Sequence, residues 1–375
     1  MQGFYKKIFF FAIVMAICPQ ILFALPRGTI SSKSYFCIEC HQKETPGVVY
    51  DWIESPHARS YVYCLECHGE TEKGPGIIEH HGFFVRVVVS PYQCGACHSA
   101  QAKEHFESRH HFALRNLQRM KPDDPRYPLI EPYKKDNFKA CADCHGSEVQ
   151  LLEDGTPDPS TWPNRGIGRV NPDGSKGTCT ACHERHRFSI DSARRPEACL
   201  KCHDGKNYPE GAIYLHSTHG TIYNAIGAEW DLSKPNVYLD VRDFKAPTCA
   251  TCHVGGVGKG VMPRHDVSTR LWVDLITPFG QYKPVEPEPR RRMKATCLKC
   301  HTAPMVERYL KNAERLLNEY VSQVLKPKVK EFQKRLSEVQ GPGRKDLLEE
   351  FSAFLAESKR YRMNLFMGHH GRMER

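Results

Sequence analysis

Apolar residues recur at three- and four-residue steps in the C-terminal part of the chain. The series begins with Val306, Leu310, Ala313 and Leu317, and charged residues lie between its members. Because an α-helix has about 3.6 residues per turn, this period predicts an amphipathic helix, which we expect Pro327 to kink or end. We expect the helix to pack on the rest of the chain or on another subunit. Two further helices are predicted to carry Val329, Phe332, Leu336 and Val339, and Leu347, Phe351 and Leu355, with Gly341 and Gly343 between them.

A second apolar series lies at the N-terminus. Two lysines precede apolar residues from Ile8 to Cys18, and Ala24 suits a cleavage site. Pro19 interrupts the run before it reaches the roughly 20 apolar residues of a membrane span. We therefore expect residues 1–24 to be a cleaved signal peptide and the protein to be periplasmic, with an uncleaved N-terminal anchor as the alternative.

One pattern accounts for every other cysteine among the 17 in the chain. The sequence Cys-x-x-Cys-His occurs eight times, far more often than this composition produces by chance. The first four copies are Cys37, Cys40 and His41; Cys64, Cys67 and His68; Cys94, Cys97 and His98; and Cys141, Cys144 and His145. The last four are Cys179, Cys182 and His183; Cys199, Cys202 and His203; Cys249, Cys252 and His253; and Cys297, Cys300 and His301.

The histidine in each motif separates two interpretations. Paired Cys-x-x-Cys sequences also build zinc sites, but zinc does not require a histidine directly after every second cysteine. In heme c attachment, cysteines three apart on one helical turn present both sulfurs to the heme, and the next residue brings its imidazole under the iron. Heme c is assembled outside the cytoplasm, in agreement with the predicted leader. The sequence therefore predicts eight covalently attached heme c groups.

The motifs are closely spaced along the chain. Between Cys37 and His301 the chain has about 33 residues for each motif, which is too few for every motif to have a hydrophobic core of its own. We expect the hemes themselves to form the core, within electron-transfer range in a chain whose radius of gyration is about 20 Å. The predicted fold is mainly α with extensive loops, and an octaheme cytochrome c domain at 25–302 precedes C-terminal amphipathic helices at 303–375.

Twelve further histidines could supply the opposite axial ligands. Seven such ligands would leave one heme open. We expect six segments between the motifs to supply ligands, and the seventh to be the second member of a His-His pair or His105. Methionine is a less favoured alternative, and His216, His369 and His370 are interpreted as surface residues. The candidates in the six segments are His57, His80 or His81, His110 or His111, His186, His219 and His265.

Features outside the motifs change this picture less. Stretches 117–137 and 150–178 flank the fourth motif with little period, which predicts loops that shape access to its heme.

The formal charge of +10 falls to +8 without residues 1–24, and ionised heme propionates would offset it, so it does not indicate an acidic partner. We interpret the basic cluster Arg290–Lys294 as a solvated face or a propionate partner and expect no nucleic acid.

One long run, from Trp162 to Cys202, and three shorter segments at 217–220, 246–249 and 265–267 carry a family likeness. They resemble the octaheme hydroxylamine oxidoreductases, and the likeness extends from about residue 35 to the final helices. The resemblance implies that the fourth heme, on Cys141, Cys144 and proximal His145, keeps an open position for the nitrogen of hydroxylamine, nitrite or nitric oxide. It also implies that the other seven hemes are bis-histidine and pass electrons. The most specific part runs from Trp162 to Cys202, and Ser217-Thr-His219-Gly220, Ala246-Pro-Thr-Cys249 and His265-Asp266-Val267 fit as well.

Two departures from that family bear on the reaction. Its members have an Asp-His pair after the sixth motif, where this chain has Asn207 and Tyr208. Asparagine is no base near pH 7, whereas a tyrosine with a pKa near 10 still donates a proton; the two residues could equally line a turn. Hydroxylamine-oxidising members also carry a crosslinking tyrosine beyond the long helices, and residues 371–375 contain no recognisable equivalent. Uncrosslinked relatives are associated with reduction.

These observations together predict a periplasmic octaheme oxidoreductase acting on small nitrogen compounds. We expect reduction of nitrite or hydroxylamine to be favoured over oxidation of hydroxylamine, with His145, Tyr208 and Asn207 as the catalytic residues. The expected partners are a redox-partner cytochrome or a quinol-linked donor and a small nitrogen-oxide substrate, and the resemblance implies a homotrimer. The alternative is an electron-transfer cytochrome that has lost its active site.

Overall fold

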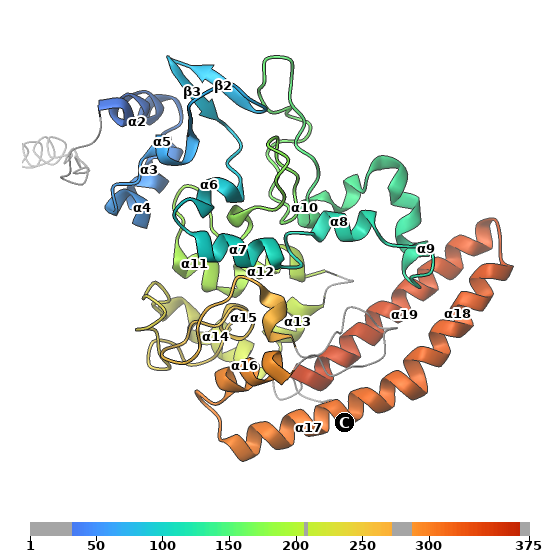
Figure 1. Cartoon of the computed structure of the whole chain (residues 1–375). Helices are drawn as coiled ribbons and strands as arrows, with labels where there is room; N and C mark the ends of the chain where they lie inside the picture. The colour runs from blue at the N-terminus through green and yellow to red at the C-terminus, as the bar shows by residue number, and fades with distance from the viewer. Residues whose placement is uncertain (1–31, 206–208, 272–286, 368–375) are drawn as a thin grey trace, which may run out of the picture.

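The computed structural model describes residues 32–205, 209–271 and 287–367 (Figure 1). These residues form many short helices, a small sheet and, at their C-terminal end, long helices. The predicted leader at 1–24 lies outside them. No helix of the described part is long and apolar enough to cross a membrane.

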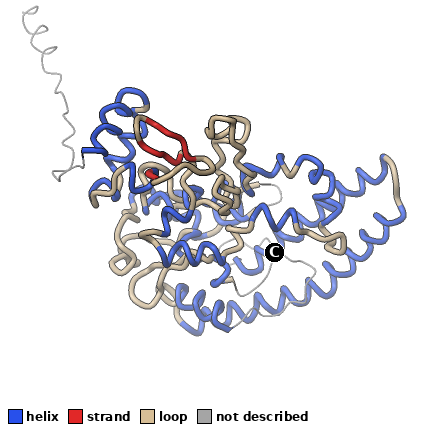
Figure 2. The backbone as a smooth tube through the Cα atoms, turned by 45° about the horizontal axis from the view of Figure 1, so that its top comes forward, coloured by secondary structure: helices blue, strands red, loops and turns tan. Residues whose placement is uncertain are grey.

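The N-terminal part packs short helices against the sheet, as Figure 2 shows. Ile38, Val49, Trp52 and Tyr63 are buried together in this part and form a small apolar core. The antiparallel sheet has the strand order β1-β3-β2. The elements are α2 (Ser32–Glu44), α3 (Pro46–Glu54), α4 (Pro56–Arg59), α5 (Cys64–His68), β1 (Gly69–Glu70), β2 (Ile77–His80) and β3 (Phe83–Arg86).

The middle of the chain consists of short helices that begin at local capping residues. The hydroxyls of Ser90, Ser217 and Thr248 each accept a hydrogen bond from the first turn of the helix that follows, and such caps satisfy amides that the helix leaves open. Helices α5, α10, α12 and α15 end on the histidine of a motif, so one helical turn holds both cysteines and the imidazole. The helices are α6 (Pro91–Gly95), α7 (Ser99–Glu107), α8 (Ala113–Gln118), α9 (Tyr127–Ile130), α10 (Ala142–His145), α11 (Ile190–Arg194), α12 (Pro196–His203), α13 (Glu210–Leu215), α14 (Thr218–Ile226) and α15 (Cys249–His253).

The two stretches expected to be loops differ in structure. Stretch 150–178 consists of turns with isolated bridges, such as Glu148 to Val170, and agrees with the prediction. Stretch 117–137 does not, because it holds α9 and a 3₁₀ helix at Glu131–Asp136. Proline stands early in both helices, where its missing N–H costs no hydrogen bond. Pro128 and Pro132 therefore stand at helix starts, while Pro122 and Pro125 lie in the turns before them.

The C-terminal helices follow the predicted period. They are α16 (Pro287–Cys297), α17 (Ala303–Tyr320), α18 (Lys326–Glu338) and α19 (Pro342–Met367), and α17 buries Val306, Leu310, Ala313 and Leu317. The helix does not end at Pro327. A π-helical segment at Val321–Leu325 joins α17 to α18, so Pro327 falls in the first turn of α18. The wider π turn accommodates a residue that lacks an N–H and would clash with the preceding turn.

These helices share one apolar core. Leu317, Leu325, Phe332 and Phe351 are at most 1 % exposed within it, and α19 runs back along α18 (Figure 1). Cysteines 252 and 297 pack against the same core. The C-terminal helices therefore contact the motif-bearing part directly, and the boundary at 302/303 stays a prediction.

Truncation of this core is expected to destabilise the protein strongly. Phe351 is fully buried, and its ring centroid lies 4.9 Å from that of Phe332. We expect Phe351→Ala to lower the free energy of unfolding by about 3–5 kcal/mol. The variant loses the apolar burial of the ring, and the cavity that remains destabilises the fold further. Guanidinium unfolding of the holoprotein, followed by circular dichroism, measures this value. Glu357→Ala, at an exposed position of the same helix, is the control and should change it by less than about 0.5 kcal/mol; equal effects would contradict the prediction.

Candidate functional site

A single large cavity runs through the described part of the chain. Its volume is about 3470 Å³, several times the roughly 300–1,000 Å³ of an ordinary ligand pocket. Both cysteines and the histidine of all eight motifs line it. Among the described residues, no three His, Cys, Asp or Glu side chains gather as they would around one metal ion. The size of the cavity and its lining by all eight motifs therefore suit several large ligands.

Six motif histidines face a second histidine ring across this cavity. The ring centroids of each pair are 6.1 to 6.5 Å apart. If metal–imidazole bonds are about 2 Å long, as zinc makes, two imidazoles on opposite sides of one metal have ring centres roughly 6 Å apart. The pairs are His41–His80, His68–His186, His98–His57, His183–His265, His203–His110 and His301–His219.

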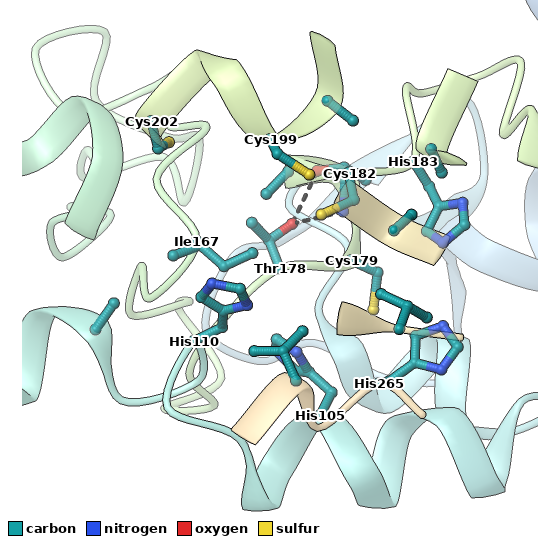
Figure 3. Close-up of a pocket in the computed structure, with 18 of the residues that line it drawn as sticks. His105, His110, Ile167, Thr178, Cys179, Cys182, His183, Cys199, Cys202 and His265 are labelled. Atoms are coloured by element: carbon teal, nitrogen blue, oxygen red, sulfur yellow. Dashed lines mark hydrogen bonds between the residues drawn. The ribbon is translucent and has the colours of Figure 1, made fainter. Parts of the chain in front are cut away.

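The pairs join segments that are distant in sequence. In Figure 3, His183 of the fifth motif and His265 lie one above the other, and His110 approaches from the segment opposite the sixth motif. Burial, with a smaller contribution from the paired ring, lowers the pKa of His110, His183 and His186 to about 4. These imidazoles are therefore neutral at pH 7, which is the form that binds a metal.

Sulfur atoms of different motifs also lie against one another. The side chains of Cys94 and Cys179, of Cys199 and Cys249, and of Cys144 and Cys202 are hydrogen-bonded. Cys37 contacts Cys64 in the same way, while Cys67 and Cys94, Cys182 and Cys199, and Cys252 and Cys297 are close enough for their charges to interact. These contacts place the motifs in the order one, two, three, five, six, seven, eight. The fourth motif joins this series at the sixth.

The comparisons with known proteins agree with this geometry. The family described as "Seven times multi-haem cytochrome CxxCH" matches residues 61–330. The chain belongs to the multiheme CxxCH cytochromes. The cytochrome binds multiple hemes covalently through its CxxCH motifs.

The relatives of the cytochrome are distant. A "Probable nitrite reductase-hydroxylamine oxidoreductase fusion protein" of Kuenenia stuttgartiensis is 26% identical over 341 residues, which are 76% of this chain and 36% of the relative. The cytochrome therefore spans about a third of that relative's length. A solved "Hypothetical multiheme protein" superposes with a TM-score of 0.74 and 23% identity, covering 90% of this chain and 91% of that one. A structure of the "Kuenenia stuttgartiensis reducing HAO-like protein complex" superposes with a TM-score of 0.54 and 21% identity. The match covers 81% of this chain and 63% of that one. These structures show a mainly helical multiheme fold.

Side chains around the cavity fit the heme groups of the cytochrome. Nδ1 of His68 donates to the carbonyl oxygen of Arg86 (2.7 Å), and Nδ1 of His145 to that of Ala113 (3.0 Å). Each bond fixes the tautomer that keeps its lone pair on Nε2, which is the atom that faces a metal. Arg86 Nη1 and Arg270 Nε are buried without a hydrogen-bond partner among the described residues, and both side chains line the cavity. Carboxylates of the size of a heme propionate suit such donors.

Two of the paired histidines of the cytochrome, His203 and His265, face carboxylates instead of carbonyl groups. Nδ1 of His203 lies 3.7 Å from Oε1 of Glu210, and Nδ1 of His265 lies 3.8 Å from Oε2 of Glu104. Burial raises the pKa of Glu210, but His203 and Lys359 outweigh this effect and hold it below its usual value. Sequence reasoning missed both glutamates, because neither lies in a motif and only the fold brings them to a histidine.

The structure distinguishes the members of the two predicted His-His pairs. His80 and His110 face motif histidines, whereas His81 is exposed and His111 packs against His105 at a centroid distance of 5.5 Å. The six pairs use one residue from each predicted segment, while the ligand assignments themselves stay predictions. His216 is exposed, as interpreted.

The fourth and seventh motifs lie outside the six pairs. His253 of the seventh motif is buried, which lowers its pKa to about 4. The predicted catalytic residues Asn207 and Tyr208 lie outside the described residues, as do His369 and His370. The identity of the seventh distal ligand therefore stays a prediction. Of its candidates, His105 has a buried Nε2 without a hydrogen-bond partner in the described part and lies beside His111.

The basic cluster at 290–294 is paired with acids. Arg290 contacts Glu314 at 2.5 Å, Arg291 contacts Glu288 at 2.6 Å, and Lys294 contacts Glu307. Arg292 also reaches Glu288, at 2.9 Å. Only Arg291 is strongly exposed, while Arg290, Arg292 and Lys294 are largely buried. The cluster is therefore a set of ion pairs, and the predicted solvated face holds for Arg291 alone.

Proposed function

We propose that this chain is a periplasmic octaheme cytochrome c that reduces hydroxylamine or nitrite at the heme of its fourth motif. The observation that carries the proposal is the set of six facing histidine pairs in one cavity, combined with a motif order in which the fourth motif is a side branch of the sixth. Bis-histidine hemes transfer electrons, and a site at the end of a branch receives them. The other motifs then serve as the route for electrons.

The relationship to the Kuenenia stuttgartiensis fusion protein supports the substrate class. The name of that relative contains both nitrite reductase and hydroxylamine oxidoreductase activities, and the matched region covers most of this chain. The resemblance around Trp162–Cys202 supports an open heme at the fourth motif. We also propose a homo-oligomer that receives electrons from a cytochrome or a quinol-linked donor.

The residues of the fourth motif have defined tasks in this reaction. When bound, heme c supplies one-electron chemistry and an open coordination position for a nitrogen atom. Cys141 and Cys144 fix the heme, and Nδ1–H of His145, held by the Ala113 carbonyl oxygen, orients the imidazole toward the metal. Two electrons and two protons convert hydroxylamine to ammonia and water, and the named donor supplies the electrons through the branch. Proton donation by Tyr208 stays a prediction.

Spectroscopy of the purified holoprotein tests this proposal. We expect one high-spin heme that binds cyanide or nitrite beside low-spin hemes, and reduction of nitrite and hydroxylamine by reduced viologen. The Cys141→Ser/Cys144→Ser variant should lose both signals. The Cys37→Ser/Cys40→Ser variant is the matched control: it removes the first motif, at the far end of the order, and should keep the ligand response. Fast hydroxylamine oxidation with negligible reduction would contradict the proposed direction.

A second candidate is an electron-transfer cytochrome without catalysis. It is favoured by one observation, the replacement of the family's Asp-His pair by Asn207 and Tyr208. The same spectra separate the two candidates. Eight low-spin hemes that respond to no added ligand would support the second candidate and overturn the first.

A further inference from the structure

A buried carboxylate connects the sixth motif to the C-terminal helix. Glu210 begins α13, and its Oε1 lies 3.7 Å from Nδ1 of His203 and 2.7 Å from Nζ of Lys359 on α19. Its Oε2 is buried and has no hydrogen-bond partner among the described residues. The side chains of Glu210 and Lys359 are only 23% and 14% exposed, before any heme covers them. The charges at this position are therefore poorly screened by water.

A carboxylate beside the nitrogen of an axial imidazole that faces away from the metal changes the reduction potential of that metal. At 3.7 Å, Glu210 is too far from Nδ1 of His203 for a hydrogen bond, so it acts on the site through its charge. Negative charge near a heme stabilises the ferric form over the ferrous form, because the ferric form carries one more positive charge. This effect lowers the reduction potential.

The proximal histidine of the fourth motif makes a different contact at Nδ1. Nδ1 of His145 donates to a neutral backbone carbonyl group, that of Ala113. The fourth and sixth motifs are neighbours, since Cys144 and Cys202 are in contact. Two adjacent hemes with unlike partners on their proximal histidines have unlike potentials.

We propose that Glu210 is a positioning residue that lowers the potential of the sixth heme and so makes this heme the electron donor to the fourth. The inference rests on the proposed function for the direction in which electrons are used. One electron would leave the ferrous sixth heme, and the fourth heme with its bound substrate would accept it; the cytochrome or quinol-linked donor proposed above would then reduce the sixth heme again. Oxidation of substrate would require the opposite order of potentials.

Lys359 has the opposite effect at the same position. Its ammonium group pairs with Glu210 and offsets part of the carboxylate charge. The sixth heme therefore senses two residues of opposite sign, one on the motif-bearing part and one on α19. Removing either charge should shift the potential, and the two shifts should have opposite signs.

Spectropotentiometric titration of the holoprotein at pH 8 tests the proposal. We expect Glu210→Gln to raise the equilibrium constant for reduction of one low-spin heme about tenfold. For a one-electron couple, this corresponds to a rise of about 59 mV in its reduction potential. Lys359→Gln, which keeps a hydrogen-bond donor toward Glu210, should lower the potential of the same heme. Glu357→Gln, exposed on the same helix, is the control and should shift none.

A second variant identifies the heme that shifts. His110→Ala should open the sixth heme and create an additional high-spin species, so Glu210→Gln in that background should shift this species most. A smaller shift of the seventh heme is expected because the charge of Glu210 also reaches His253. Unchanged potentials, equal signs for the two variants, or a largest shift at another heme would overturn the proposal. The titration needs no substrate, so it gives its answer even if the protein proves inactive.

Discussion

Without its hemes, the chain is expected not to hold this fold. The cavity lined by the motifs has a volume of about 3470 Å³. An unfilled apolar cavity costs about 24 cal/mol per Å³, so even a tenth of this volume would cost about 8 kcal/mol. Whole domains are stable by only about 5–15 kcal/mol. The empty structure would therefore collapse or unfold.

Expression with and without the machinery that attaches heme c tests this result. The heme-free chain should lack the helical circular dichroism of the holoprotein, should show no cooperative melting and should be digested rapidly by protease. The C-terminal helices have an apolar core of their own, so residual helix from that region is compatible with the prediction. A heme-free chain with a holoprotein-like spectrum and one sharp transition would contradict it.

Replacing His110 by alanine is expected to open one heme, whereas replacing its neighbour His111 is not. The ring of His110 lies 6.3 Å from that of His203, while His111 faces His105. His110→Ala should therefore convert one low-spin heme to a high-spin heme that binds cyanide. It should also slow viologen-driven reduction, because the sixth motif is the neighbour of the fourth.

The adjacent pair makes this comparison well controlled. Both residues lie in one segment, and both have pKa values that burial lowers. His111→Ala should leave the number of low-spin hemes and the cyanide response unchanged. The same contrast is expected between His80 and His81. A new high-spin heme in His111→Ala, with none in His110→Ala, would contradict the pairing seen in the structure.

The sequence predicts those features that depend on local chemistry. The motif spacing predicts heme attachment, which family membership confirms, and the apolar period at Val306–Leu317 predicts α17, which the structure contains. Proline misled the reasoning twice. Pro327 follows a π turn instead of ending a helix, and Pro128 and Pro132 of the stretch 117–137 stand at helix starts. In each case, the helix satisfies its hydrogen bonds around the proline in a way that composition does not reveal.

Long-range features of the site could not be predicted in the same way. The sequence offers His80 and His81, or His110 and His111, as equals, and only the backbone direction in the fold selects one of each. The pairing of His68 with His186 joins residues more than a hundred positions apart. Glu210 reaches His203 only because α13 turns back beside the sixth motif. Such contacts are set by packing around the hemes, which local patterns do not record.

The branched order of the motifs gives the molecule two ends. One arm of this order runs from the first motif to the sixth, and the other runs from the eighth motif to the sixth. The fourth motif lies beside the sixth, where the two arms meet. In the proposed octaheme reductase, hemes held in this order would store electrons as well as conduct them. Single electrons would enter at either end, remain on both arms and be drawn in succession at the fourth heme. A reaction that consumes electrons in even numbers would then run from donors that deliver them singly, without release of half-reduced products.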